Sequence, residues 1–214
     1  MIKLDILSDP ICPWCYIGKA QLDRALEAAP AHPFTVEWHP FQLNPEMPAG
    51  GMDRRDYLEA KFGGRDGAIE VYSRIATHAE AAGLEINFDR IARTPNTLNA
   101  HRLIHWAGLE GRQTPMVAAL FRAYFVEGKD IGDAESLVQI AKGAGLEAAM
   151  VTRLLASDAD IEDIRARDAN ARARGVTGVP TFIIANQHVL TGAQSPDLWS
   201  TVIDDISDQL KAAE

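Results

Sequence analysis

Apolar and polar residues follow two different periods along the chain, and the change of period divides it into parts. Near the start, Ile2 to Leu7 is an almost unbroken apolar run of strand length, and apolar residues then recur at helical spacing to about Ala29. Phe34 to Phe41 alternates apolar and polar residues, which predicts a second strand. Strand, helix and strand in this order predict a βαβ unit with two parallel strands and a right-handed crossover.

The middle of the chain has an almost wholly helical period. Gln42 to Met52 is rich in proline and glycine and predicts a loop, after which the helical pattern runs from about Asp53 to Arg174. Thr114 and Pro115 predict an N-cap and a first-turn proline for one of these helices. The predicted apolar faces are Ile69, Tyr72, Ile75, Ala76 and Ala79; Val117, Leu120, Phe121, Tyr124 and Phe125; Leu137, Ile140, Ala141 and Ala144; and Val151, Leu154 and Leu155.

Strand character returns near the end of the chain. Thr181 to Ala185 and His188 to Thr191 flank Asn186 and Gln187, which predicts a β-hairpin. A last amphipathic helix then starts at Ser195 and Pro196, as N-cap and first helical residue. The fold class predicted is therefore α/β, with a core of residues 1–52 and 158–214 that is interrupted by a helical insertion of residues 53–157.

Composition narrows the function classes. Of the 214 residues, 47% are hydrophobic and 24% are charged, as in ordinary globular proteins, and the net charge of −9 argues against nucleic acid or an anionic membrane as a partner. No apolar run is long enough to span a membrane. Because Met1 leads directly into a predicted strand, no signal peptide fits before it, and we expect a cytoplasmic protein.

Both cysteines lie in one short motif, Cys12-Pro13-Trp14-Cys15, between the first strand and the first helix. Free backbone N–H groups and the helix dipole favour a thiolate at a helix start, so we expect Cys12 at or next to the N-cap with a lowered pKa. Cys15 follows one turn later and should be more buried. Pro13 suits the first turn, where its missing N–H costs nothing. We therefore predict Cys12 as the attacking nucleophile and Cys15 as the resolving thiol.

Two other uses of the cysteine pair are weaker. A structural zinc site needs two further ligands, and the remaining candidates with regular spacing are His101 and His105, far along the chain. A permanent disulfide across two residues closes too small a loop to stabilise the fold much. We therefore expect no metal and a redox-active pair.

Three features together resemble the thioredoxin superfamily, and within it the DsbA-like oxidoreductases. They are the Cys12–Cys15 motif after the first strand, the helical block between the halves of the core, and Gly178-Val179-Pro180-Thr181 before the hairpin. Further segments resemble the FrnE-like branch, which borders the kappa-class glutathione transferases and the 2-hydroxychromene-2-carboxylate isomerases. These segments are Phe41-Gln42-Leu43-Asn44-Pro45, Asn96-Thr97-Leu98-Asn99-Ala100-His101-Arg102-Leu103 and Gly192-Ala193-Gln194.

The resemblance implies roles for residues outside the cysteine motif. It implies a cis bond between Val179 and Pro180, which would place the Val179 backbone beside the Cys12 sulfur. It makes Asn44, Asn96, Asn99, His101 and Gln194 candidates for a substrate groove, although each could equally serve local structure. Trp14 stands where DsbA has a histidine and cannot place a positive charge beside the thiolate. We therefore expect a less oxidising pair than in a Cys-Pro-His-Cys site.

The predicted function is a thiol–disulfide oxidoreductase that works through a mixed disulfide, as a reductase or disulfide isomerase. It needs no cofactor, glutathione could recycle the pair, and the substrate would be a disulfide-containing protein or a small thiol. One alternative is a glutathione-dependent isomerase or transferase, although such proteins carry serine where Cys12 stands. The other is a peptide-binding, chaperone-like module that uses the groove between the core and the helical block.

Overall fold

A four-stranded sheet organises the computed structural model, which describes residues 1–212. The strand order is β2-β1-β5-β6, with β1 parallel to β2 and antiparallel to β5, and β5 antiparallel to β6. This confirms the parallel βαβ unit and the hairpin. The elements of the core are β1 (Ile2–Ser8), α1 (Pro13–Ala28), β2 (Phe34–Pro40), α8 (Ile161–Ala173), β5 (Thr181–Ile184), β6 (His188–Thr191) and α9 (Pro196–Ala212).

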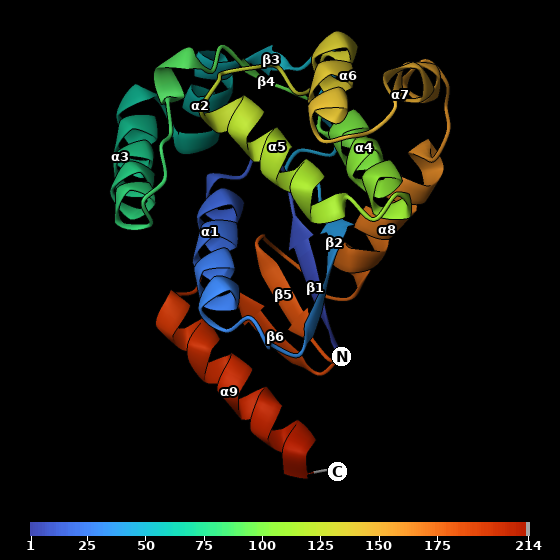
Figure 1. Cartoon of the computed structure of the whole chain (residues 1–214). Coiled ribbons are helices and arrows are strands. Elements are labelled where there is room, and N and C mark those ends of the chain that lie inside the picture. Colours follow the sequence, from blue (N-terminus) through green and yellow to red (C-terminus); the bar gives the residue numbers. More distant parts are fainter. Residues whose placement is uncertain (213–214) are drawn as a thin grey trace.

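The two faces of this sheet are covered differently (Figure 1). Leu4 and Ile6 of β1 point to the face that α1 and α9 cover, and Phe182 of β5 packs edge-on against Trp199 of α9 with ring centroids 4.8 Å apart. The alternate residues of β1, Lys3, Asp5 and Leu7, point to the opposite face, where α8 packs against β2. The period-2 pattern of the strands therefore builds one dry face and one mixed face.

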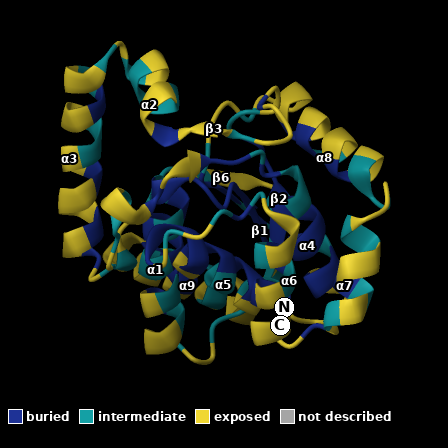
Figure 2. Ribbon diagram, turned by 90° about the horizontal axis from the view of Figure 1, so that it is seen from above, coloured by how far each residue is buried: buried dark blue, intermediate teal, exposed yellow. Residues whose placement is uncertain are grey.

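The helical block lies above the end of the sheet at which β1 finishes and α1 starts (Figure 1). It comprises α2 (Arg54–Phe62), α3 (Arg65–Ala81), α4 (Leu98–Leu109), α5 (Gln113–Phe125), α6 (Ala134–Gly143) and α7 (Ala148–Leu155), with a 3-10 turn at Phe88–Arg90. Its apolar faces join the core of the sheet in one buried cluster, the dark band at the centre of Figure 2. The fold is the predicted thioredoxin type with a helical insertion. The exact division at residues 52/53 and 157/158 stays a prediction.

Several local predictions need correction. A two-residue strand pair, β3 (Met52–Asp53) with β4 (Arg93–Thr94), lies inside the segment expected to be wholly helical. Strands this short carry no periodic signal. Ala185 belongs to the hairpin turn and not to β5, with a φ of 54°. Thr114 lies inside α5 and does not cap it; its hydroxyl accepts a hydrogen bond from Trp38 Nε1 at 2.9 Å.

The faces of the helices are otherwise close to those expected, with one exception. In α3 the buried positions are Ala68, Ile75 and Ala79, whereas two residues of the predicted face are exposed, Ala76 and Ile69, the latter to 53%. The predicted cap of the last helix is confirmed, since the Leu198 N–H donates to Ser195 Oγ at 3.3 Å. Among residues 1–212 no helix has the length and apolarity that a membrane crossing requires.

Candidate active site

Cys12 occupies the N-cap of α1, as predicted, and Pro13 is the first helical residue. The Cys12 backbone is extended, with φ −85° and ψ 113°, and its carbonyl accepts hydrogen bonds from the N–H groups of Cys15 and Tyr16. The side chain makes no capping hydrogen bond, so the thiol is not engaged by the helix end. Cys12 therefore stands at the N-terminus of α1, as predicted, with its thiol free to make contacts outside the helix.

Cys15 lies one turn along α1 and is the more deeply buried of the two free cysteines. Burial raises the pKa of its thiol well above the ordinary value, and the neighbouring Cys12 thiol adds to that rise. The Ser8 hydroxyl and the Asp9 backbone, which face the sulfur, partly offset it. Cys15 is therefore held as a protonated thiol until a reaction at Cys12 changes its surroundings.

The loop before β5 completes the surroundings of Cys12. The bond between Val179 and Pro180 is cis, and the Cys12 thiol donates to the Val179 carbonyl at 3.6 Å. Gly18 allows α1 to approach this loop, because a β-carbon there would lie 3.1 Å from Pro180 Cγ. The geometry implied by the resemblance is present: two segments 167 residues apart in the sequence meet at one sulfur.

Trp14, between the cysteines, links α1 to the helical block. It is partly exposed, and its ring lies edge-on to His78 of α3 with centroids 5.0 Å apart. Around it, Ile17 packs with Ile75 and Ala79 of α3. The helix start that carries the dithiol therefore rests against α3.

Asp9 carries a buried carboxyl next to the dithiol. No local pattern in the sequence singles this residue out. It has no exposed surface and accepts hydrogen bonds from the N–H groups of Ile11 at 3.2 Å and Leu43 at 2.6 Å. Burial raises the pKa of Asp9 to about 7, and these backbone donors only partly oppose the rise. Asp9 also holds the motif in place, since its carbonyl accepts from the Cys12 N–H at 2.9 Å.

His101 faces this carboxyl from α4. Its Nε2 lies 4.0 Å from Asp9 Oδ1, is buried and has no hydrogen-bond partner within residues 1–212. Burial lowers the pKa of His101 to about 4. His101 thus lies in the layer beneath the dithiol loop, which fits the position expected for it, while a chemical role stays a prediction.

Comparisons with known proteins agree with this geometry. A family model described as a DSBA-like thioredoxin domain matches residues 3–204. The chain belongs to the DsbA-like thioredoxin family. This confirms the DsbA-like resemblance and is consistent with the FrnE-like branch.

Individual relatives of this DsbA-like protein cover nearly its whole length. An uncharacterized protein, YwbO of Bacillus subtilis (strain 168), is 29% identical over 206 residues, which are 95% of this chain and 96% of the relative. The crystal structure of the probable DsbA oxidoreductase SCO1869 from Streptomyces coelicolor is 31% identical, with a TM-score of 0.85 over 96% of this chain and 89% of that one. The cytosolic disulfide reductase DsbM of Pseudomonas aeruginosa, in a structure with GSH, shares the fold at 24% identity, with a TM-score of 0.68 over 98% and 99% of the two chains.

The other predicted groove residues of this DsbA-like chain are engaged in local hydrogen bonds. The Asn96 side chain donates to the Met47 carbonyl at 2.7 Å and accepts from the Leu98 N–H at 2.9 Å. Asn99 accepts from Arg102 at 2.8 Å, and Gln194 donates to the Thr191 carbonyl at 2.6 Å. Asn44 accepts from the Tyr57 hydroxyl at 3.0 Å. Each side chain thus braces a loop or helix start, and a role in substrate binding stays a prediction.

Sequence reasoning also missed Arg54, at the start of α2. The residue is 8% exposed; its Nη1 donates to the Tyr124 hydroxyl at 3.1 Å, and Nη2 is buried without a partner within residues 1–212. Its Cζ lies 5.0 Å from the centre of the Tyr72 ring, and Tyr72 and Trp14 pack against the same apolar cluster. Within residues 1–212 the Arg54 guanidinium has no carboxylate at ion-pair distance. Burying an unpaired charge costs free energy, and an anionic ligand would offset that cost.

One group of side chains on the sheet has the spacing of metal ligands. The ligand atoms of Asp5, Glu37 and His39 lie within 4.8 Å of one another. The ammonium of Lys3, however, lies 3.0 Å from Asp5 and 2.8 Å from Glu37. Because this cation already supplies the positive charge, we interpret the group as an ion-pair cluster and not as a metal site.

Proposed function

We propose that this DsbA-like protein is a thiol–disulfide oxidoreductase that acts as a reductase or disulfide isomerase through Cys12 and Cys15. The observation that carries the proposal is the position of Cys12: its thiol lies at the N-cap of α1 and is hydrogen-bonded at 3.6 Å to the carbonyl of Val179. That arrangement gives the sulfur a helix N-terminus, which favours its thiolate, and a neighbouring backbone against which an extended substrate can lie.

The reaction follows from the different positions of the two sulfurs, Cys12 at the N-cap of α1 beside Val179 and Cys15 one turn into the helix. The Cys12 thiolate attacks one sulfur of a substrate disulfide and forms a mixed disulfide, and the other substrate sulfur leaves as a thiolate. The Cys15 thiol then loses its proton and attacks the Cys12 sulfur, which releases the second substrate thiolate and leaves a Cys12–Cys15 disulfide. Because the pKa of Cys15 is raised by burial, we expect the second step to need a loss of the negative charge at Cys12, which the mixed disulfide provides.

Recycling the pair needs two electrons, and we propose glutathione as their source. Two glutathione thiols reduce the Cys12–Cys15 disulfide and become glutathione disulfide, so atoms and electrons balance. The support is the unpartnered buried guanidinium of Arg54, which suits a peptide carboxylate, together with the fold shared with DsbM, whose structure was obtained with GSH. A cytoplasmic setting, where glutathione is abundant and reduced, belongs to the same proposal.

Reduction of insulin disulfides tests the dithiol. Cys12→Ser should abolish the reaction, whereas Cys15→Ser should arrest it as a mixed disulfide that a non-reducing gel displays, because nothing then resolves the intermediate. Reduction that survives Cys12→Ser would contradict the proposal and favour a binding module.

Arg54 tests the reductant separately. With glutathione as electron source, Arg54→Met should raise the KM for glutathione about 10-fold, as expected for the loss of one charge-assisted hydrogen bond. With dithiothreitol, which has no carboxylate, the rate should be unchanged, which also shows that the variant is folded. An equal loss with both reductants would exclude Arg54 from glutathione binding.

A further inference from the structure

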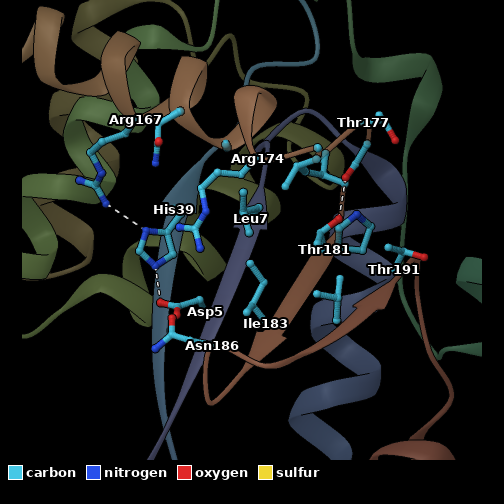
Figure 3. A pocket seen from close by; sticks show the side chains of 18 of the residues that line it. Asp5, Leu7, His39, Arg167, Arg174, Thr177, Thr181, Ile183, Asn186 and Thr191 are labelled. Atoms are coloured by element: carbon cyan, nitrogen blue, oxygen red, sulfur yellow. Dashed lines mark hydrogen bonds and ion pairs between the residues drawn. The ribbon is translucent and has the colours of Figure 1, made fainter.

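A cavity lies on the mixed face of the sheet and reaches Val179 and Pro180, the loop that contacts Cys12 from another side. Its volume is about 760 Å³, and its lining comes from β1, β2, α8, the segment 174–180, β5 and β6 (Figure 3). Neither cysteine lines it. This volume lies within the roughly 300–1,000 Å³ that small-molecule sites occupy in proteins. The cavity exists because α8 packs over β2 and leaves the same face of β5 and β6 open.

The floor of the cavity is apolar. Leu7, Ile183 and Val189 lie on the same face of β1, β5 and β6. In the sheet register Ile183 pairs with Val189 and with Asp5, whereas Leu7 pairs with Thr181. Leu7 is buried against Ala171 of α8, whereas Val189 remains 58% exposed.

One wall of the cavity carries two arginines, of which only one has a carboxylate at ion-pair distance within residues 1–212. Arg167 and Arg174 lie seven residues apart and point from α8 and its C-terminal end toward the sheet (Figure 3). The carboxylate that pairs with Arg167, Asp163, lies 3.8 Å away and is largely exposed. Within residues 1–212, the Arg174 guanidinium has no carboxylate at ion-pair distance, unlike Arg165 and Arg172 of the same helix.

Hydrogen bonds hold the Arg167 guanidinium in place. Its Nη1 donates to His105 Nδ1 at 3.2 Å and its Nη2 to His39 Nδ1 at 3.3 Å. Because arginine can only donate, both imidazole Nδ1 atoms are acceptors, and His39 must carry its hydrogen on Nε2. That Nε2–H donates to Asp5 at 2.5 Å. The Asp5 carboxylate is thus occupied by His39 and Lys3, and Arg167 is held against His39 and His105 at the edge of the cavity.

We propose that this cavity is a binding site for a small amphiphilic anion, with its carboxylate or sulfonate on Arg167 and Arg174 and its apolar body on Leu7, Ile183 and Val189. The net charge of −9 disfavours a polyanion, whereas a single acidic group meets two guanidinium groups locally. Threonine and asparagine side chains at the rim, Thr177 and Asn186 among them, keep the entrance polar. The proposal does not rest on the proposed dithiol chemistry.

The probe is 1-anilinonaphthalene-8-sulfonate, a sulfonate on an apolar ring system that fluoresces when it leaves water. One equivalent should bind the wild-type protein, and decanoate should displace it where decanol does not. Arg174→Glu should weaken binding at least about 10-fold, because an attractive charge becomes repulsive. Arg165→Glu, an exposed charge change on the same helix outside the cavity, is the matched control and should leave binding unchanged.

Amide chemical shifts locate the probe. Saturation should move the signals of residues 174–179 and of Ile183 and leave those of α2 and α3 unmoved. The proposal is overturned if the probe does not bind, if the two arginine variants bind it equally, if a neutral analogue such as N-phenyl-1-naphthylamine binds as tightly, or if the shifts cluster elsewhere. Insulin reduction measured on the same variants keeps this outcome separate from that of the dithiol proposal.

Discussion

Two aspartates four residues apart, Asp5 in β1 and Asp9 just after it, each lie close to a histidine. The surroundings of the two pairs differ. Asp5 and His39 form a hydrogen bond of 2.5 Å on the mixed face of the sheet, with Lys3 and Arg167 beside them. Asp9 and His101 lie 4.0 Å apart in the layer beneath the dithiol, both buried, and no lysine or arginine within residues 1–212 forms an ion pair with Asp9.

The difference shows that the surroundings of an aspartate–histidine pair, and not the residue types, decide its hydrogen bonds and its protonation. Asp5 lies 3.0 Å from the Lys3 ammonium and accepts a hydrogen bond from the His39 imidazole at 2.5 Å. Asp9 meets only backbone N–H groups and the Thr97 hydroxyl, so burial dominates and raises its pKa to about 7. Since burial also lowers the pKa of His101 to about 4, the buried pair is neutral through mildly acidic pH, with its proton on Asp9.

The largest expected effect is the pH dependence of folding that Asp9 imposes. An unfolded aspartate loses its proton near pH 4 and the folded one near pH 7, so in this interval the folded state binds more protons and stability falls as pH rises. The fall reaches about 4 kcal/mol if Asp9 acts alone. Asp9→Asn removes it, and urea unfolding at pH 4.5, 6 and 7.5 should show the variant gaining on the wild type as pH rises. A difference that is constant with pH, as expected for the exposed control Asp163→Asn, would contradict the burial argument.

His101 should give a smaller slope of opposite sign. The unfolded imidazole takes up a proton below about pH 6.5 and the folded one only below about pH 4, so this residue makes stability rise over that interval. The rise is about 3 kcal/mol at most. The two slopes oppose each other in the wild-type protein, so His101→Asn should make stability fall more steeply with pH between 4 and 6.5. The same unfolding series measures it, and an unchanged or shallower profile would show that the buried imidazole titrates normally.

The sequence predicted the parts of the site that depend on local signals. Cys12 and Pro13 mark a helix start by residue type alone, and Ser195 marks another, and the structure has all three where expected. The parallel β1–β2 pair followed from the periodicity of two runs and the length between them. The meeting of Val179 with Cys12 came only from the family resemblance, because the two residues are 167 positions apart.

The remaining features depend on contacts that no local pattern encodes. In the sequence, Asp9 before Pro10 is an ordinary turn residue; its burial is created by Leu43 and Thr97, 34 and 88 positions away. Asn96 and Asn99 belong to a motif of the FrnE-like branch and were therefore predicted at a groove, yet their hydrogen bonds brace a loop and a helix. Arg167 lies in a charged stretch of the sequence with no signal that sets it apart. Its contact with His39 of β2 exists only because α8 packs against β2.

The third prediction concerns the pair with charged neighbours, Asp5 and His39. Arg167 bridges two imidazoles with two separate nitrogens, a geometry that the single ammonium of lysine cannot reproduce. Arg167→Lys keeps the charge and should lower the free energy of unfolding by about 1 kcal/mol, since one net hydrogen bond is lost. Urea unfolding at pH 7 measures the loss, with Arg165→Lys as the control on the exposed side of α8. An equal effect of the two substitutions would show that the bridge contributes nothing to stability.

The smallest expected effect separates the two partners of Asp5. Lys3 is about half exposed and pairs with both Asp5 and Glu37, so solvent and salt screen it, and Lys3→Met should cost about 0.5 kcal/mol. The cost should become smaller in about 1 M salt, because salt screens charges that are exposed to solvent. A loss of several kcal/mol in the free energy of unfolding that persists in salt would contradict this expectation. It would show that the Lys3 ammonium, and not His39, is the main partner of Asp5. The contrast between the two pairs would then rest on one lysine at the start of the chain, since without Lys3 only His39 would remain as a partner on Asp5.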